Sequence, residues 1–268
     1  MPAIVVLVKH VPDTWSRKAL EGDHTLDRVN VDSVIDEINE FAMEQALQLR
    51  DDNPDAGYRV IALTMGPAGA DETLRKALAM GADDAVHLLD DALAGSDLLG
   101  TTWALTNALN TIAATDDVAL IVAGNASSDG AMGALPGILA EYRQVPALTG
   151  VRSVALDGQT VTAVRETSAG RYELSAQLPA IISVTDKAPK PRFPNFKGLM
   201  AAKKHEITVL DIAAIGVDAA QVGLAHSATA VTAATQRPER TAGDVIGGAD
   251  GEAAAARVAA FLADEKFL

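Results

Sequence analysis

Short apolar runs recur through the first half of this chain, and each is followed by a stretch with helical periodicity. The runs cover residues 3–9 (AIVVLVK), 59–66 (RVIALTMG), 85–89 (AVHLL) and 118–124 (VALIVAG). A continuous apolar run of this length is typical of a strand buried on both faces of a parallel sheet. Because strand and helix alternate four times, the sequence predicts an α/β fold, a Rossmann-like parallel sheet with helices on both faces.

The segments between these runs contain helix signals. Residues 36–52 place their apolar side chains on one helical face, and residues 71–81 begin with acids and end at a glycine that favours a C-terminal cap. Residues 96–115 begin at a capping Ser-Asp pair. We expect a fourth helix over residues 131–142, interrupted by Pro136.

The pattern changes after Pro146. Two alternating runs within residues 151–166 flank an Asp-Gly turn, and residues 171–177 follow a second turn, which predicts an antiparallel addition to the sheet. Residues 178–184 (LPAIISV) return to a buried strand, and the last strong helix pattern covers residues 252–265. We therefore expect one α/β domain over residues 1–212 and an extended C-terminal arm over residues 213–268 that packs on another subunit.

Charge and composition argue against several classes of function. The 36 acids outnumber the 22 bases, and nucleic-acid binding is disfavoured because it needs Lys and Arg to neutralise phosphates. The chain has no cysteine, which excludes disulfides and thiolate metal sites, and its five histidines lack ligand-like spacing. No apolar run approaches the roughly 18–20 residues of a membrane span, so we expect a cytoplasmic protein that is not membrane-embedded.

The loop after the fourth apolar run, GNASSDG at residues 124–130, is the strongest candidate ligand site. Ligands of open parallel sheets bind beyond the carboxyl ends of the strands, and free amides at a helix start favour a phosphate. Gly130 and Gly133 allow the backbone to approach a ligand. An ordinary capped loop explains the pattern equally well. Dinucleotide and P-loop fingerprints are absent from the sequence, as are catalytic constellations, so the pattern indicates a nucleotide-sized site without a reaction centre.

A basic stretch stands out within this acidic chain. Residues 190–204 (KPRFPNFKGLMAAKK) contain five bases and no acid, with prolines and phenylalanines interleaved. We expect a stiff loop there, because prolines restrict the backbone. A merely solvated loop would not need Phe193 and Phe196, so the stretch favours a partner-docking loop over residues 187–204.

Several segments together resemble, in order and spacing, the beta subunit of electron transfer flavoprotein, a FixA-like family. The segments that resemble it are residues 6–14, 36–47, 64–83, 123–142, 164–166, 178–184, 191–204 and 240–243.

This resemblance implies an electron-carrier subunit, not an enzyme, that forms a heterodimer with an alpha subunit. The alpha subunit would bind most of the FAD, and the beta subunit would hold a structural AMP in its own nucleotide-binding fold. The pair would accept electrons from acyl-CoA and related flavin dehydrogenases and pass them to a membrane quinone oxidoreductase. The flavin then supplies the chemistry that the chain's own residues lack. The arm would pack on the alpha subunit through Val258, Phe261 and Leu262.

The family's AMP-binding positions transfer to this sequence residue by residue. They are Leu7, Asp36, Glu37, Ile38, Asn39, Met65, Gly124, Asn125, Ala126, Ser127, Ser128, Asp129, Gly130, Ala131, Met132, Gly133, Ala134 and Leu135. Asn125 replaces the family's common lysine, so the resemblance leaves backbone amides and serine hydroxyls to bind the phosphate. Ile38 replaces an aromatic residue that approaches the flavin in some members.

The docking positions transfer in the same way, and Phe196 falls where an apolar anchor, often leucine, enters a pocket on the dehydrogenase. The docking positions are Arg192, Phe193, Phe196, Lys197, Met200, Lys203 and Lys204. Prolines would lower the entropy lost on docking, and the lysines would steer or pack.

Two alternatives remain open at this point, and a third lacks the motif that it requires. One is the bifurcating form of the same family, with a second FAD in place of AMP. Another is an adenine-nucleotide-binding regulatory protein of similar fold, which has no need of the basic stretch or the arm. An ATP-pyrophosphatase-like enzyme would need a Ser-Gly-Gly-x-Asp-Ser loop, which this sequence lacks.

Overall fold

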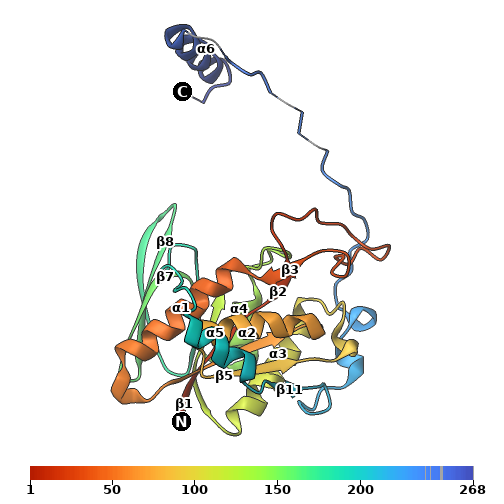
Figure 1. The fold of residues 1–268 in the computed structure, drawn as a ribbon, viewed down its shortest axis with the longest axis vertical. Helices are drawn as coiled ribbons and strands as arrows, with labels where there is room; N and C mark the ends of the chain where they lie inside the picture. The colour runs from red at the N-terminus through yellow and green to blue at the C-terminus, as the bar shows by residue number, and fades with distance from the viewer. Residues whose placement is uncertain (239, 242, 248–249, 268) are drawn as a thin grey trace. The chain divides into compact units, whose positions relative to one another are not determined.

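The computed structural model describes residues 1–238, 240–241, 243–247 and 250–267, and the chain divides into two compact units, Met1–Thr232 and Ala233–Leu268 (Figure 1). The sequence placed this boundary at residue 212 instead. Residues 213–232 belong to the first unit because Ile215, Val217 and Val222 bury their side chains in its core. Among the described residues, no helix is both long and apolar enough to cross a bilayer.

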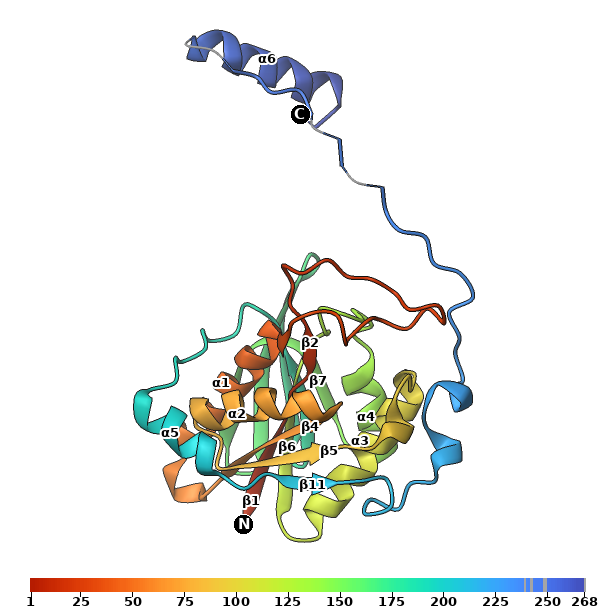
Figure 2. The same cartoon turned by 45° about the vertical axis from the view of Figure 1, so that its right-hand side comes forward.

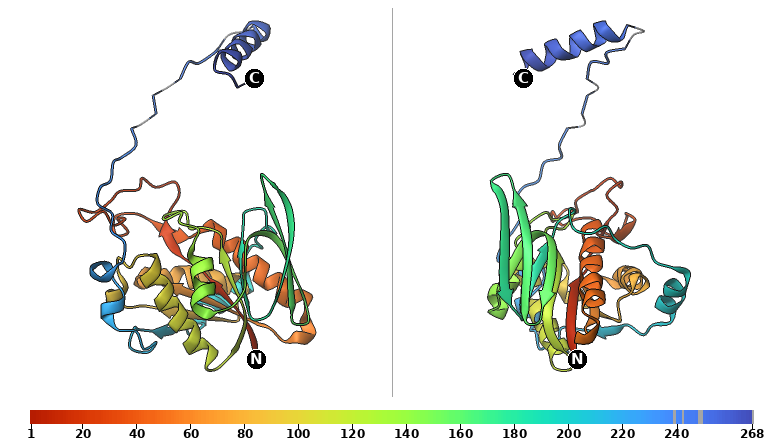
Figure 3. Two further views of the ribbon diagram at one scale, coloured as in Figure 1. Left: turned by 180° about the vertical axis from the view of Figure 1, so that it is seen from behind. Right: turned by 90° about the vertical axis from the view of Figure 1, so that its left-hand side faces the viewer.

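A nine-stranded sheet forms the centre of the first unit. Its strands, in spatial order, are β11 (Thr208–Leu210), β5 (Asp84–Leu88), β4 (Arg59–Met65), β1 (Pro2–Leu7), β6 (Asp117–Gly124), β10 (Ala180–Val184), β7 (Ala147–Asp157), β8 (Thr160–Thr167) and β9 (Gly170–Gln177). Neighbouring strands from β11 to β7 are parallel, and β8 and β9 continue the sheet antiparallel at the edge visible in green in Figure 3. The parallel sheet and its antiparallel addition confirm the prediction.

The central strands are apolar throughout because both faces of the sheet are covered. In β1, Ile4 and Val6 join the core beneath one helical layer, and Val5 and Leu7 join the core on the opposite face, as the period of two in a strand requires. Figure 2 shows the two layers. The first layer contains α1 (Glu37–Asp52) and α2 (Asp71–Met80), and the second contains α3 (Leu98–Ala113) and α4 (Leu135–Arg143).

Helix α4 begins later than the sequence pattern predicted. Its first residue is Leu135, and Pro136 lies in its first turn, where a missing N–H costs no hydrogen bond. Residues 125–134 are therefore loop, and Gly130 does not lie at a helix start as expected.

A helix also replaces the second part of the expected docking loop. Helix α5 (Phe196–Lys204) is capped by Asn195, whose side chain accepts a hydrogen bond from the backbone N–H of Gly198 at 2.8 Å. It packs on α2, and a Cβ added at Gly198 would lie 2.6 Å from the carbonyl oxygen of Ala79. Gly198 is thus required by this close contact.

Three further strands were not predicted from the sequence: the edge strand β11, and the antiparallel pair β2 (His10–Pro12) and β3 (Ser33–Ile35). Each has only three residues, too few for a periodicity signal. The described part of the second unit contains helix α6 (Gly251–Asp264), close to the predicted range, and none of the residues of this helix is buried.

Candidate functional site

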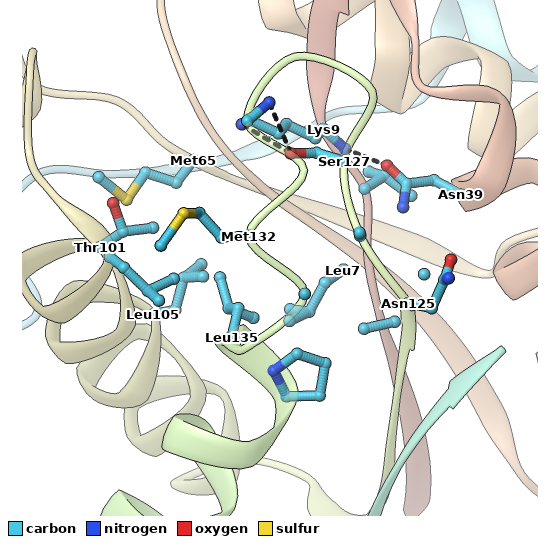
Figure 4. A pocket seen from close by; sticks show the side chains of 18 of the residues that line it. Leu7, Lys9, Asn39, Met65, Thr101, Leu105, Asn125, Ser127, Met132 and Leu135 are labelled. Atoms are coloured by element: carbon cyan, nitrogen blue, oxygen red, sulfur yellow. Dashed lines mark hydrogen bonds between the residues drawn. The ribbon is translucent and has the colours of Figure 1, made fainter. Parts of the chain in front are cut away.

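The candidate site lies at the topological switch point of the sheet, where successive strands change from one side of β1 to the other. From β1 the chain adds β4 and then β5 on one side, whereas β6 pairs with the other side of β1. Loops diverge at such a switch point, and they leave a crevice beyond the carboxyl ends of the strands. A cavity of about 250 Å³ lies there (Figure 4). Its volume is near the lower end for small-molecule sites, which range from roughly 300 to 1,000 Å³.

The structure gathers most of the sequence-predicted site residues around this cavity. The predicted residues that line it are Leu7, Asn39, Met65, Gly124, Asn125, Ala126, Ser127, Gly130, Met132, Gly133 and Leu135. The predicted residues outside its lining are Asp36, Glu37, Ile38, Ser128, Asp129, Ala131 and Ala134.

The start of α3 forms a wall of the cavity that the sequence interpretation missed. Ser96, Asp97, Leu98, Thr101 and Leu105 contribute to this wall. Their sequence signal was an ordinary helix start, and only the closeness of α3 to the switch point makes them part of the site. Met65, Thr101 and Met132 lie together on this side in Figure 4.

Lys9 is the cation of the cavity, and sequence reasoning overlooked it. It follows β1 directly, its backbone N–H donates to Asn39 Oδ1 at 2.8 Å, and its side chain crosses toward the loop after β6 (Figure 4). Lys9 Nζ lies 2.7 Å from Asp129 Oδ1 and 3.4 Å from Ser127 Oγ. A positive charge therefore stands at the cavity even though Asn125 replaces the family's common lysine. The sequence signal that could have identified Lys9 was its position directly after the first strand, at the switch point.

Asp129 fixes the loop to two other segments of the chain. Its carboxylate is only 2% exposed, and it accepts from Lys9 and, at 2.5 Å, from a terminal guanidinium nitrogen of Arg28. Burial would raise the pKa of Asp129, but the charge of Lys9 and the hydrogen bonds from Lys9, Arg28 and Ser127 hold that pKa well below its usual range. The loop is thereby tied to the segment between β2 and β3.

Asp36 secures the other end of the same loop. The carboxylate accepts from the backbone N–H of Ser128 at 2.8 Å, although the residue is only 2% exposed. Burial raises the pKa of Asp36, and the hydrogen bonds from Ser128 partly oppose that rise. Asp36 and Asp129 thus shape the loop from behind and do not face the cavity.

Backbone geometry shapes the loop at positions other than Gly130. Ala131 and Gly133 have positive φ angles of 50° and 66°, a region that favours glycine. A Cβ at Gly130 would meet only Ser127 Oγ, at 3.4 Å. Gly124, in contrast, has no space for a side chain, because a Cβ there would lie 2.6 Å from Ile38 Cγ2. Ile38 therefore packs against the end of β6 from outside the cavity.

The loop offers hydrogen-bond donors to an anion. No acceptor within the described residues takes the backbone N–H groups of Met132, Gly133 or Leu135. Lys9 and Ser127 add a cation and a hydroxyl, while Leu7, Leu105 and Leu135 supply an apolar wall. A flat apolar ring and a phosphate fit this combination of donors and wall.

The family model described as electron transfer flavoprotein domain matches residues 23–215. The chain belongs to the electron transfer flavoprotein family. It is 53% identical over 249 residues to the electron transfer flavoprotein subunit beta of Mycobacterium tuberculosis, covering 92% of each chain, and 52% identical to that of Mycobacterium leprae with the same coverage. It is also 31% identical to the caffeyl-CoA reductase-Etf complex subunit CarD of Acetobacterium woodii, over 91% of this chain and 92% of that one. These matches confirm the resemblance noted in the sequence.

In this electron transfer flavoprotein chain, the predicted docking residues divide into two groups. Phe193 is 95% exposed and Phe196 is 79% exposed, and Lys197, Met200, Lys203 and Lys204 are exposed as well. Arg192 differs, because its guanidinium is bound within the protein to Glu44 and Asp51 on α1.

Proposed function

We propose that this chain is the beta subunit of a heterodimeric electron transfer flavoprotein. Together with an alpha subunit that binds most of the FAD, it accepts electrons from flavin dehydrogenases such as acyl-CoA dehydrogenases. It then passes them to a membrane quinone oxidoreductase. The observation that carries the proposal is the match to curated beta subunits over 92% of the chain. The chain acts as a carrier subunit, and the flavin supplies the redox chemistry.

The cavity at the switch point is proposed to bind AMP. Lys9, Ser127 and the unpaired amides of Met132 and Gly133 would hold the phosphate, and the apolar wall would take the adenine. The volume of about 250 Å³ supports a mononucleotide in preference to a dinucleotide. The nucleotide would have a structural role, tying the loop after β6 to β1 and α3.

A bifurcating subunit with a second FAD is the alternative function. It is favoured by the similarity to the Acetobacterium woodii protein, which is named as part of a reductase-Etf complex. The small cavity argues against it, because a dinucleotide has a pyrophosphate and a second ring system to accommodate. Two flavins per heterodimer would decide for this alternative.

The tail is proposed to pack on the alpha subunit. In α6, Val258 is 45% exposed and Phe261 is 56% exposed, and Leu262 lies on the same helical face. An apolar face of this kind on a helix without a core of its own needs a partner to be buried. The alternative is that the helix folds back on its own chain.

The dehydrogenase is proposed to bind at the exposed aromatic side chains before and within α5. Phe196 would be the anchor that enters a pocket, and Lys197, Lys203 and Lys204 would steer the encounter. The exposure of Phe196, 79%, supports this role and is inconsistent with Phe196 filling the protein's own core.

Phe196→Ala in the purified heterodimer tests this proposal. An aromatic anchor contributes about 2 kcal/mol or more, so we expect the KM for the flavoprotein in an acyl-CoA dehydrogenase assay to rise roughly thirtyfold. Thermal stability and the FAD and AMP contents should stay near wild type, because Phe196 is exposed. The neighbouring Lys197→Ala is the comparison: losing a rim charge should alter mainly the salt dependence. Unchanged KM in Phe196→Ala, or lost stability with intact kinetics, would contradict the proposal.

A further inference from the structure

The exposed Phe193 lies within a segment that has very few hydrogen bonds of its own, and the exposed Phe196 follows that segment. Residues 189–194 include prolines at 189, 191 and 194, which lack a backbone N–H. Within the described chain, every hydrogen bond made between Pro189 and Pro194 involves Arg192. The position of this segment therefore depends on one side chain and its own backbone N–H.

Arg192 binds Glu44 in the middle of α1. Its backbone N–H and its Nε donate to Glu44 Oε2 at 3.1 and 2.7 Å, and a terminal nitrogen donates to Oε1 at 3.1 Å. The other terminal nitrogen donates to Asp51 Oδ2 at 2.9 Å. Gln48 donates to Glu44 Oε1 at 2.9 Å and so helps to orient the carboxylate. This bidentate pairing uses the edge of the guanidinium that would otherwise receive a partner's carboxylate.

Burial makes the pair unlike a surface ion pair. Glu44 is only 4% exposed, and a buried carboxylate is costly unless it is paired and hydrogen-bonded. Helix α1 tolerates Glu44 on its packed side because Arg192 satisfies it. The two residues lie 148 positions apart in the sequence, so the pair specifies where this segment crosses the helix.

Helix α5 is fixed separately. Arg75 on α2 donates to the carbonyl oxygens of Ala202 and His205 at 2.7 and 2.6 Å. Loss of the Glu44–Arg192 pair would therefore free residues 189–194 and leave the end of α5 in place. Phe193 lies entirely on the freed part, and Phe196 lies at its junction with the helix.

We infer that Glu44 and Arg192 are positioning residues for dehydrogenase docking, and that Arg192 acts by fastening residues 189–194 to α1, not by contacting the dehydrogenase. This inference rests on the proposed docking function. A segment held in one position loses less conformational entropy on binding than a free one. Among the hydrogen bonds described above, Arg192 is the predicted docking residue that Glu44 contacts. Glu44, which is buried, then influences docking through Arg192.

A double-mutant cycle in the purified heterodimer tests the inference. Glu44→Gln and Arg192→Gln should each raise the KM for the flavoprotein in an acyl-CoA dehydrogenase assay by about tenfold, with kcat unchanged, because the freed segment must be ordered on docking. The double variant should be no worse than Arg192→Gln, since that variant already removes the guanidinium that binds both Glu44 and Asp51. Limited trypsin digestion should cut after Lys187, which precedes Ala188, faster in all three. Glu40→Gln is the matched control, since Glu40 lies one turn earlier on α1 and pairs with Lys76 at the surface.

The outcomes separate this inference from the proposed function. If Arg192→Gln raises KM and flattens its salt dependence while Glu44→Gln does not, Arg192 contacts the dehydrogenase directly and the inference is wrong. Additive effects in the double variant would also overturn it. If Glu44→Gln lowers the amount of folded heterodimer, Arg192→Gln and its digestion rate still decide the matter, because Arg192 lies outside the helices and strands. If wild type and Phe196→Ala show equal KM values, the docking proposal itself fails.

Discussion

Replacing Gly124 by alanine probes the packing beneath the cavity at the switch point. The new Cβ would lie 2.6 and 2.9 Å from Ile38 Cγ2 and Cγ1 and 3.1 Å from Asn39 Nδ2. Non-bonded carbon atoms pack at about 3.5–4.0 Å, so Ile38 must move by roughly 1 Å. Asn39 moves with it, and because Asn39 Oδ1 accepts from the backbone N–H of Lys9, the disturbance reaches the cation of the cavity.

Overpacking of this kind costs about 1–3 kcal/mol, and each kcal/mol lowers Tm by roughly 2–4 °C in a protein of about this size. We therefore expect Gly124→Ala to lower the Tm of the purified heterodimer and to reduce its AMP content after acid extraction. Gly137→Ala is the matched control, because nothing lies within 4 Å of its new Cβ. Alanine in a helix is also favoured over glycine by up to about 1 kcal/mol.

Ile38→Ala provides the decisive second step. It removes both atoms that the new Cβ would strike, so Gly124→Ala/Ile38→Ala should recover stability and AMP content relative to the sum of the single effects. Neighbouring residues couple by about 0.5–3 kcal/mol in such cycles. A Gly124→Ala protein with wild-type Tm and AMP content would refute the reasoning, as would strictly additive effects in the double variant.

Three further predictions concern charge and domain structure. Asp129 has a folded-state pKa below its unfolded value of about 3.9, so the stability that its carboxylate contributes is present above that pH and is lost as the pH falls. In acid titrations followed by circular dichroism, Asp129→Asn should therefore lose less stability below about pH 4 than wild type. An identical acid profile for the two proteins would contradict this prediction. Lys9→Met should weaken AMP binding by about tenfold or more, since hydrogen bonds to charged groups contribute roughly 1.5–3 kcal/mol, and unchanged calorimetric affinity would exclude Lys9 from the phosphate site. A chain ending at Thr232 should keep the fold of the first unit but fail to assemble with the alpha subunit, whereas normal assembly on gel filtration would favour a helix that folds back on its own chain.

The central strands could be predicted from the sequence because burial on both faces leaves an unbroken apolar run. Residues 3–9 and 118–124 show this, and the structure pairs them at the switch point. The predicted loop after β6 likewise lines the cavity. Local pattern suffices in these cases because strand burial and loop position follow from the alternation of elements.

Local pattern failed where a distant contact decides the structure. Helix α5 was missed because the neighbouring prolines indicated a stiff loop, yet it forms because Gly198 allows a close approach to Ala79 on α2. The pairs Lys9–Asp129 and Arg192–Glu44 join residues 120 and 148 positions apart, so no window of the sequence contains both partners. Arg192 was accordingly assigned to the docking surface by resemblance, although its side chain points into the protein's own ion pairs.

The nucleotide and flavin content of the purified complex tests the central claim most directly. The chain should be co-expressed with its alpha subunit, the heterodimer extracted with acid, and the released cofactors quantified by chromatography and absorbance. The account predicts one FAD and one AMP per heterodimer, and little or no flavin on this chain expressed alone. Two FAD molecules and no AMP would contradict it and assign the bifurcating form, and a complex that releases no AMP would remove the nucleotide from the cavity at the switch point.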